Sequence, residues 1–219
     1  DIAVNNAKTS NNHICIYEES KNIEERYKEN IELATQIKEA ILGNRIICHY
    51  QPLLNIENSE IYSYESLVRL IDNKGNSLAP YKFLDFSKKI KLYSSITKIV
   101  VDKACKTFQN RDENFSINLS VDDIKDLETV DFILKTIKET NTSSRVTFEI
   151  LESEGIENYQ EVISFINQIK SLGARIAIDD FGTGYPNFDH LLLLDVDYIN
   201  IDGSLINNIV TDDTHRLIV

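Results

Sequence analysis

Two adjacent carboxylates, Asp179 and Asp180, end the apolar run IAIDD and are followed at once by the glycine-containing stretch FGTGY. Adjacent like charges at the end of a buried strand repel each other unless cations offset them. Two further acids, Glu65 and Glu149, and the amide of Asn118 lie in other apolar stretches. All five side chains offer hard oxygen donors, which suit Mg²⁺ or Mn²⁺ better than Zn²⁺. The sequence therefore predicts a divalent-cation site built from these residues.

Two such ions about 3.5–4 Å apart are the usual arrangement for in-line hydrolysis of a phosphate ester. Adjacent aspartates can serve one ion each or bridge the two. Arg69, on the same predicted strand face as Glu65, is placed to clamp a substrate phosphate. Simpler explanations stay open for each residue taken alone. The Asp179–Asp180 pair can cap a loop, Glu65 and Arg69 can form a structural ion pair, and Asn118 can merely end a strand.

Six strand-like segments are expected to position these side chains. They are residues 47–55, 61–70, 115–120, 145–150, 175–180 and 198–202. Helices are expected between most of them, at residues 80–91, 94–109, 123–139 and 159–172, with a short one after residue 187. From the third strand on, this alternation predicts a parallel α/β sheet, either a barrel or a doubly wound sheet.

The strands are expected to have one apolar face for the helices and one polar face. Because successive side chains point to opposite faces, Asn118 opposes Ile117, and Glu149 opposes Phe148. In the last strand Asn200 falls on the polar face, opposite Ile199 and Ile201. In a closed barrel the polar faces would meet inside, near the carboxyl ends of the strands where barrel active sites lie.

The composition limits the class of protein. The 219 residues carry 23 Lys and Arg against 35 Asp and Glu, a net charge of −12, which argues against binding of a nucleic-acid polymer. No apolar run reaches the roughly 20 residues that a membrane span requires. Cys15, Cys48 and Cys105 are too widely spaced for a zinc site and predict reduced thiols in a cytoplasmic protein.

Several motifs resemble one family, and they occur in its order between about residues 46 and 206. They are HYQPLLN, YESLVRL, FSINLS, FEILES, IAIDDFGTGYPNF and VDYINIDGSLI, with Glu65-Ser66-Leu67 in place of Glu-Ala-Leu. The set resembles the EAL family of cyclic di-GMP phosphodiesterases. The resemblance implies a (β/α)8 TIM-like barrel with an antiparallel second strand. It also implies metal-dependent hydrolysis of cyclic di-GMP to the linear dinucleotide pGpG in bacterial second-messenger signalling.

The resemblance also assigns roles to residues. It implies that two Mg²⁺ or Mn²⁺ ions are bound by Glu65, Asn118, Glu149 and Asp179, with Asp180 at the second metal or the attacking water. It also implies that the substrate is contacted by Gln51, Leu67 and Arg69. Glu152 matches a glutamate that stabilises the loop DFGTGYPNF. Asn200 stands where the family has a catalytic lysine near the attacking water.

That substitution leaves an alternative open, namely a degenerate EAL domain that binds cyclic di-GMP or regulates a partner without turnover. The expected organisation is the tail of a GGDEF domain at residues 1–20, a connector helix at 21–44 and an EAL domain at 45–219. The EAL part is expected to stop after its sixth strand. Family resemblance further suggests a homodimer, linked GGDEF and sensor domains in the parent protein, and no membrane contact from this segment.

Overall fold

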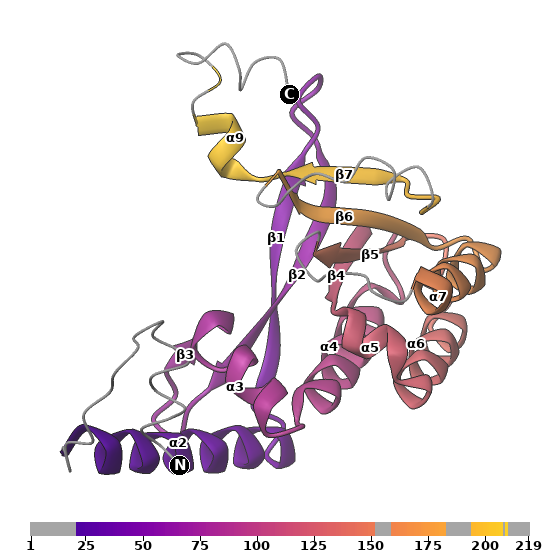
Figure 1. Cartoon of the computed structure of the whole chain (residues 1–219). Coiled ribbons are helices and arrows are strands. Elements are labelled where there is room, and N and C mark those ends of the chain that lie inside the picture. The colour runs from indigo at the N-terminus through magenta and orange to yellow at the C-terminus, as the bar shows by residue number, and fades with distance from the viewer. Residues whose placement is uncertain (1–20, 152–158, 183–193, 208, 210–219) are drawn as a thin grey trace.

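The fold is built on one mixed β-sheet of seven strands. The structure is a computed structural model, and it describes residues 21–151, 159–182, 194–207 and 209 (Figure 1). The strands are β1 (Ile46–Leu54), β2 (Ile61–Ile71), β3 (Ser77–Leu78), β4 (Asn114–Leu119), β5 (Val146–Leu151), β6 (Arg175–Phe181) and β7 (Tyr198–Ile201). Their order is β1-β2-β4-β5-β6-β7, with the short β3 paired to β2.

From β2 onward the main strands run parallel, and β1 runs antiparallel to β2. The antiparallel pair expected at the start of the sheet is therefore present. The strand that opposes the others is the first one, however, and not the second as expected. Six residues separate β1 from β2, which suits a hairpin, whereas a parallel connection needs a crossover of a dozen or more residues.

The helices are α2 (Lys21–Leu42), the 3₁₀ helix η1 (Pro80–Lys82), α3 (Leu84–Lys89), α4 (Tyr93–Phe108), α5 (Val121–Lys125), α6 (Leu127–Glu139), α7 (Tyr159–Ser171) and α9 (Gly203–Asn207). Helices α4 to α7 lie on one side of the sheet, and α2 lies along its lower end in Figure 1. The helix expected after residue 187 and the GGDEF-like tail fall outside the described residues.

The single helix expected at residues 123–139 is instead two helices. Asp126 has an extended backbone (φ −84°, ψ 101°) and caps the start of α6 by accepting a hydrogen bond from the Glu128 amide. Ser120 and Asp123 form a reciprocal capping box at the start of α5. A helix-favouring pattern does not reveal this break, because an aspartate is compatible with both a helix and a cap.

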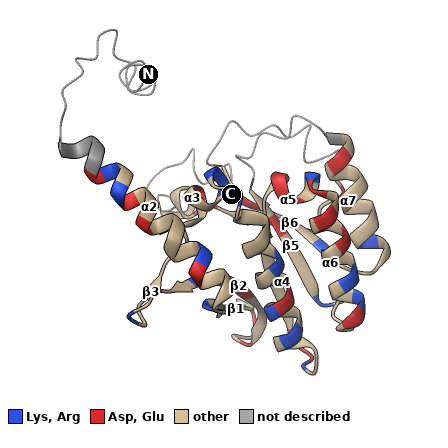
Figure 2. Ribbon diagram, turned by 90° about the horizontal axis from the view of Figure 1, so that it is seen from below, with Lys and Arg blue, Asp and Glu red and all other residues tan. Residues whose placement is uncertain are grey.

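The apolar strand faces pack against the helices as predicted. Phe115, Ile117, Phe148 and Ile150 are fully buried in one continuous core. Charged residues recur along α4, α6 and α7 (Figure 2). Strand β7 departs from the prediction, because no helix of the described residues covers its apolar face. Ile199 and Ile201 remain 44% and 40% exposed there.

The sheet curls so that β7 approaches β2, although the two are not neighbours in the strand order. The Tyr62 and Tyr198 hydroxyls are 2.6 Å apart. Arg175 on β6 donates to the Tyr198 hydroxyl at 3.2 Å and to the Asn114 side-chain oxygen at 2.7 Å. A register shift opposite Leu53 leaves Tyr62 as the extra residue of β2. Because a β-bulge re-aims a side chain, this one accounts for the turn of Tyr62 toward β7.

Replacing Phe148 with alanine tests the packing of this sheet on its helices. Phe148 is fully buried, and its ring centroid lies 6.1 Å from that of Phe165 on α7. We expect the free energy of unfolding, measured by urea titration, to fall by about 3–5 kcal/mol. Leu127→Ala is the control, because Leu127 is 78% exposed and its loss should change stability by less than about 0.5 kcal/mol. Equal effects of the two changes would contradict the assigned core.

Candidate active site

The predicted site residues come together on the inner face of the curled sheet. Glu65 lies on β2, Asn118 on β4, Glu149 on β5, Asp179 on β6 and Asn200 on β7. The Asn118 amide donates to Glu65 Oε1 at 3.0 Å. The Asn200 amide donates to Glu149 Oε1 and to Asp179 Oδ1, both at 3.1 Å. Five strands thus bring their polar side chains together, as their alternation predicts.

Asp179 and Asp180 lie in a bulge that explains how two consecutive acids can serve one site. Ile178 pairs with Ile199 and Phe181 with Ile201, so β6 has one residue more than β7 between these pairs. Asp180 has a left-handed backbone (φ 56°), which an aspartate tolerates better than most residues. In a regular strand the two side chains would point to opposite faces. Because of the bulge, Asp179 and Asp180 do not have to point to opposite faces of the sheet at the edge of the site.

The acids of this cluster disfavour one another's charge. Burial, together with the nearby Glu65 and Asp179 carboxylates, raises the pKa of Glu149 to about 7. The pKa of Glu65 is also raised, chiefly by burial and then by Asp179 and Asp180, and the Asn118 amide offsets part of this increase. The pKa of Asp180 is raised by burial and by Asp179 and Asp202. A site whose carboxylates are mutually destabilised favours a bound cation.

The donor set fits a divalent cation, although its members do not yet surround one point. Glu149 is 4% exposed, and its Oε2 atom has no hydrogen-bond partner in the described structure. Among the described residues no three Asp, Glu, His or Cys side chains are close enough to hold an ion as they stand. The amides of Asn118 and Asn200 lie between the carboxylates instead. The donors, the charge and an unsatisfied buried oxygen therefore suit a divalent ion.

The predicted substrate-binding residues lie beside this cluster. Gln51 on β1 is the direct cross-strand partner of Glu65, so both lie on the same face of the hairpin. Leu67 and Arg69 follow Glu65 on that face of β2 and are partly exposed. The Arg69 charge acts on Glu65 and lowers its pKa slightly against the larger opposing effects. Glu152, the predicted loop-stabilising residue, falls outside the described residues.

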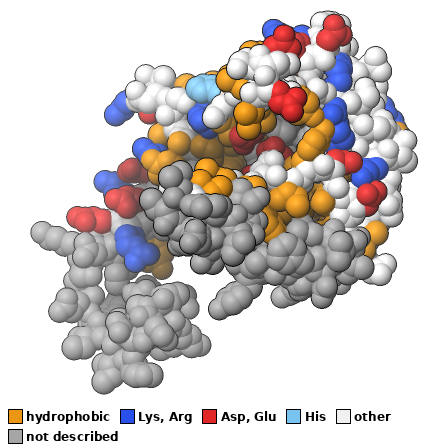
Figure 3. Space-filling view, turned by 90° about the horizontal axis from the view of Figure 1, so that it is seen from above, with side chains coloured by type: hydrophobic (Ala, Val, Ile, Leu, Met, Phe, Trp, Pro, Cys, Tyr) orange, Lys and Arg blue, Asp and Glu red, His pale blue; other side chains and the backbone are white. Residues whose placement is uncertain are grey.

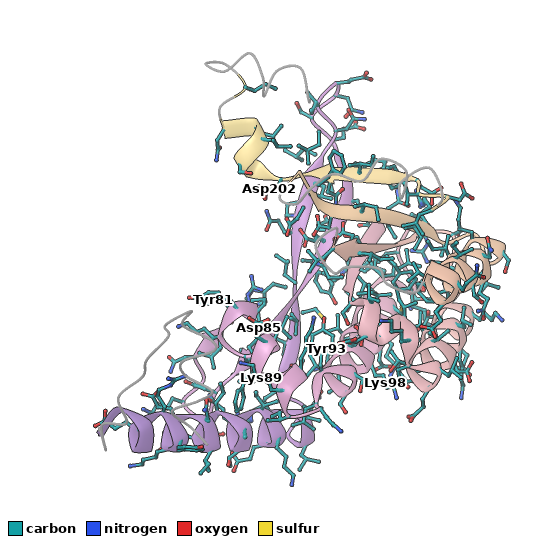
Figure 4. The ribbon with its side chains drawn as sticks, in the orientation of Figure 1. Tyr81, Asp85, Lys89, Tyr93, Lys98 and Asp202 are labelled. Carbon is teal, nitrogen blue, oxygen red and sulfur yellow. The ribbon has the colours of Figure 1, made fainter. Side chains whose placement is uncertain are left out.

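An adjoining cavity of about 240 Å³ was not predicted from the sequence. It is lined mainly by apolar side chains of β2, α4 and β4 and also by Asn118. Asp85 and Tyr93, both labelled in Figure 4, line it as well. The Ser66 hydroxyl, 2% exposed, lines it without a hydrogen-bond partner in the described structure. Only the pairing of strands and helices reveals this cavity, because its residues have no shared sequence signal.

Seen from above, acidic side chains show at the bottom of a depression that apolar side chains surround (Figure 3). Asp202, labelled in Figure 4, follows β7 at this end of the sheet. Its carboxylate accepts a hydrogen bond from the Ser204 amide at 2.8 Å, at the turn into α9.

Residues 34–219 match the EAL domain family. The chain belongs to this family. The EAL domain is 32% identical over 228 aligned positions to the cyclic di-GMP phosphodiesterase PdeB of Shewanella oneidensis, covering all of this chain and 26% of PdeB. It is 27% identical to the bifunctional diguanylate cyclase/cyclic di-GMP phosphodiesterase MucR of Pseudomonas aeruginosa, covering all of this chain and 33% of MucR. The chain thus spans a third or less of the length of these relatives.

Solved structures establish the fold of the EAL domain. The structure titled PaMucR phosphodiesterase, c-di-GMP complex, superposes with a TM-score of 0.77 at 26% identity, over 85% of this chain and 78% of that one. The EAL enzyme Bd1971, in a form bound to cAMP and cyclic di-GMP, superposes with a TM-score of 0.79 at 25% identity, over 90% of this chain and 57% of that one. The expected α/β fold, a TIM-like barrel of EAL type, is confirmed.

Gly182, directly after the acid-bearing strand of the EAL domain, offers a test of the local geometry. Its φ of +100° disfavours any side chain, and a Cβ atom there would collide with Leu205 of α9. We expect Gly182→Ala to lower the melting temperature, because either Leu205 or the chain segment that carries Asp179 and Asp180 has to shift.

Gly75→Ala is the matched control, since Gly75 also has a positive φ (+85°) but open space around it. It should cost about 1 kcal/mol of stability through the backbone alone. If both changes lowered the melting temperature equally, contact with Leu205 would not matter at Gly182.

Proposed function

We propose that this EAL domain hydrolyses cyclic di-GMP to the linear dinucleotide pGpG with the help of two Mg²⁺ or Mn²⁺ ions. The observation that carries the proposal is the meeting of Glu65, Asn118, Glu149 and Asp179 from four strands on one sheet face. The buried, unpartnered Glu149 oxygen is an acceptor that a cation would satisfy. Relatives named cyclic di-GMP phosphodiesterases support this choice of substrate.

The ions supply positive charge for the phosphoryl oxygens and an activated water when they are bound. The chain itself provides the oxygen donors, with Asp180 beside Asp179 available for a second ion or for orienting the water. Arg69 contributes a guanidinium that can hold a phosphate by two hydrogen bonds. Gln51, next to Glu65 across the hairpin, contributes a neutral donor and acceptor at the same place.

The adjoining cavity suits one base of the dinucleotide. Its walls are largely apolar, as the faces of a guanine require, and the Ser66 hydroxyl and Asp85 carboxylate offer polar contacts to the base edge. Asn118 lines the cavity and also donates a hydrogen bond to Glu65 of the acid cluster, so the cavity lies beside the carboxylates.

The relatives favour an enzyme over a binding-only domain, since the proteins matched along the whole chain include named phosphodiesterases. The test is incubation of the natural full-length protein with cyclic di-GMP and Mn²⁺ or Mg²⁺, with chromatographic detection of pGpG. We expect metal-dependent appearance of pGpG. Measurable binding of cyclic di-GMP without any product would overturn the proposed reaction.

We also propose features of the parent protein beyond the site. MucR is named as a bifunctional cyclase and phosphodiesterase, which supports a GGDEF domain that contributes residues 1–20 and a connector helix at 21–44. None of the described helices is long and apolar enough to cross a membrane. We also propose a cytoplasmic homodimer, which size-exclusion chromatography with light scattering would test.

A further inference from the structure

A second polar cluster lies nearer the amino ends of the strands than the acid cluster does. It consists of Tyr62 on β2, Asn114 on β4, Arg175 on β6 and Tyr198 on β7. The Tyr62 and Tyr198 hydroxyls are 2.6 Å apart, and Arg175 donates to the Tyr198 hydroxyl at 3.2 Å. Arg175 also donates to Asn114 Oδ1 at 2.7 Å, and the Asn114 amide donates to the Tyr62 carbonyl at 3.3 Å. These contacts close a ring of hydrogen bonds across four strands, which we call the tyrosine–arginine ring.

The tyrosine–arginine ring shares the inner face of the sheet with the acid cluster. Three of its residues precede a site residue on the same strand by an even number of positions, which places both side chains on one face. The pairs are Asn114 and Asn118, Arg175 and Asp179, and Tyr198 and Asn200. The ring is therefore the next layer of side chains on that face, and a strand that moves at the ring also moves its residue in the site.

Strand β7 has few other constraints on its position. It is four residues long, and it pairs with β6 at three positions with a register shift between the second and the third. Three strands, β4, β5 and β6, separate it from β2 in the sheet order. The Tyr62–Tyr198 contact joins β2 and β7 directly, between residues 136 positions apart in the sequence. This contact therefore fixes how far the sheet curls.

Arg175 holds the tyrosine pair to the rest of the sheet. Its guanidinium reaches the Tyr198 hydroxyl, the Asn114 side chain and, at 2.9 Å, the Ser144 carbonyl before β5. A planar guanidinium can serve several acceptors in a fixed geometry, which a lysine cannot do. The two tyrosine rings also contact each other edge to face, with centroids 6.4 Å apart. The ring thus has both the directional bonds and the packing that hold two strands in one relative position.

We propose that the tyrosine–arginine ring is a positioning element for the reaction: it holds β7 at a fixed distance from β2 and so sets the spacing of the oxygen donors across the acid cluster. The inference rests on the proposed metal-dependent hydrolysis and adds residues that act through the site. The ring side chains themselves lie a layer away from the carboxylates, so their effect should appear in the rate and in metal affinity rather than in substrate binding.

Tyr62→Phe and Tyr198→Phe, made in the natural full-length protein, each remove the hydrogen bond between β2 and β7 and keep the aromatic ring. Tyr62 is 44% exposed, so loss of its hydroxyl should leave the domain folded. We expect kcat for pGpG formation to fall about tenfold in each variant, less than the roughly 100-fold that a misplacement of about 1 Å can cost. The dissociation constant for Mn²⁺, measured by direct titration, should rise by about tenfold.

The KM for cyclic di-GMP should stay unchanged, because the predicted substrate contacts lie on the β1–β2 hairpin. The double variant should lose no more activity than either single variant, since both changes delete the same hydrogen bond. Tyr81→Phe is the matched control, because Tyr81 is 77% exposed on η1 (Figure 4). It removes a tyrosine hydroxyl from the surface and should leave kcat and Mn²⁺ affinity unchanged.

A purely structural role would lower the melting temperature of the Tyr62 and Tyr198 variants and leave kcat and Mn²⁺ affinity at wild-type values. That result would overturn the inference and leave the proposed function intact, as would losses that multiply in the double variant. A wild type that binds Mn²⁺ but forms no pGpG would overturn the proposed reaction, and the Mn²⁺ affinities of the variants would still decide the inference. A wild type that neither binds Mn²⁺ nor forms pGpG would overturn both.

Discussion

Alanine in place of Glu65 or Asp179 is expected to reduce metal-dependent hydrolysis of cyclic di-GMP by about a thousandfold or more. Each change removes one of the few oxygen donors of a site in which metal charge stabilises the transition state by several kcal/mol. Because each 1.36 kcal/mol corresponds to a factor of ten in rate, loss of about 4 kcal/mol gives this magnitude. The measurement is the initial rate of pGpG formation at saturating Mn²⁺.

Stability separates this loss from unfolding. Glu65 and Asp179 lie in a cluster whose charges oppose one another, so their removal should leave the metal-free melting temperature the same or higher. Asp131→Ala on the exposed side of α6 is the control for a lost carboxylate, and it should leave the rate unchanged. Hydrolysis at the wild-type rate by either site variant would refute the proposed ligand set.

Strand alternation was enough to predict which strand side chains face the core and which face the other side of the sheet. Phe148 and Ile150 are buried in the core, whereas Glu149 between them faces the acid cluster, as a period of two requires. The same rule placed Asn118 with Glu65 and Asn200 with Asp179. The prediction succeeded because a strand with one buried apolar face has only one acceptable orientation.

The backbone irregularities could not be predicted in this way. The alternation rule puts Asp179 and Asp180 on opposite faces, and only the bulge in β6 places both at the site. The break at Asp126 and the reversed first strand depend on connection geometry and capping, which periodicity does not record. The cavity beside Asn118 depends on packing between elements distant in sequence.

The hydrogen bonds of Asn200 also lay beyond the sequence. Position 200 was singled out because it has an asparagine where the family has a lysine. That comparison shows that the positive charge of the lysine is missing, but it does not show which contacts the asparagine makes. The structure shows that the amide joins Glu149 to Asp179. Asn200 therefore brings no charge to the site and connects β7 to β5 and β6.

Removal of divalent ions is expected to abolish hydrolysis completely. After treatment with EDTA and exchange into metal-free buffer, pGpG formation should fall to the background rate, and added Mn²⁺ or Mg²⁺ should restore it. The reason is that the described cluster contains carboxylates and amides and no lysine that could supply the missing charge. Full activity in the presence of excess EDTA would exclude the divalent-ion proposal.

Glu149→Gln shows whether the restored activity depends on this particular cluster. The change keeps the shape of the side chain and removes its charge, so the Mn²⁺ concentration for half-maximal activity should rise by about 10- to 100-fold. Burial and neighbouring carboxylates raise the pKa of Glu149 to about 7, so at pH 8 its ionised form is held at a cost in the metal-free protein. Glutamine avoids that cost, and the metal-free variant should therefore melt at a higher temperature than the wild type at pH 8. A lower melting temperature together with an unchanged Mn²⁺ requirement would show that Glu149 is a structural residue and not a ligand.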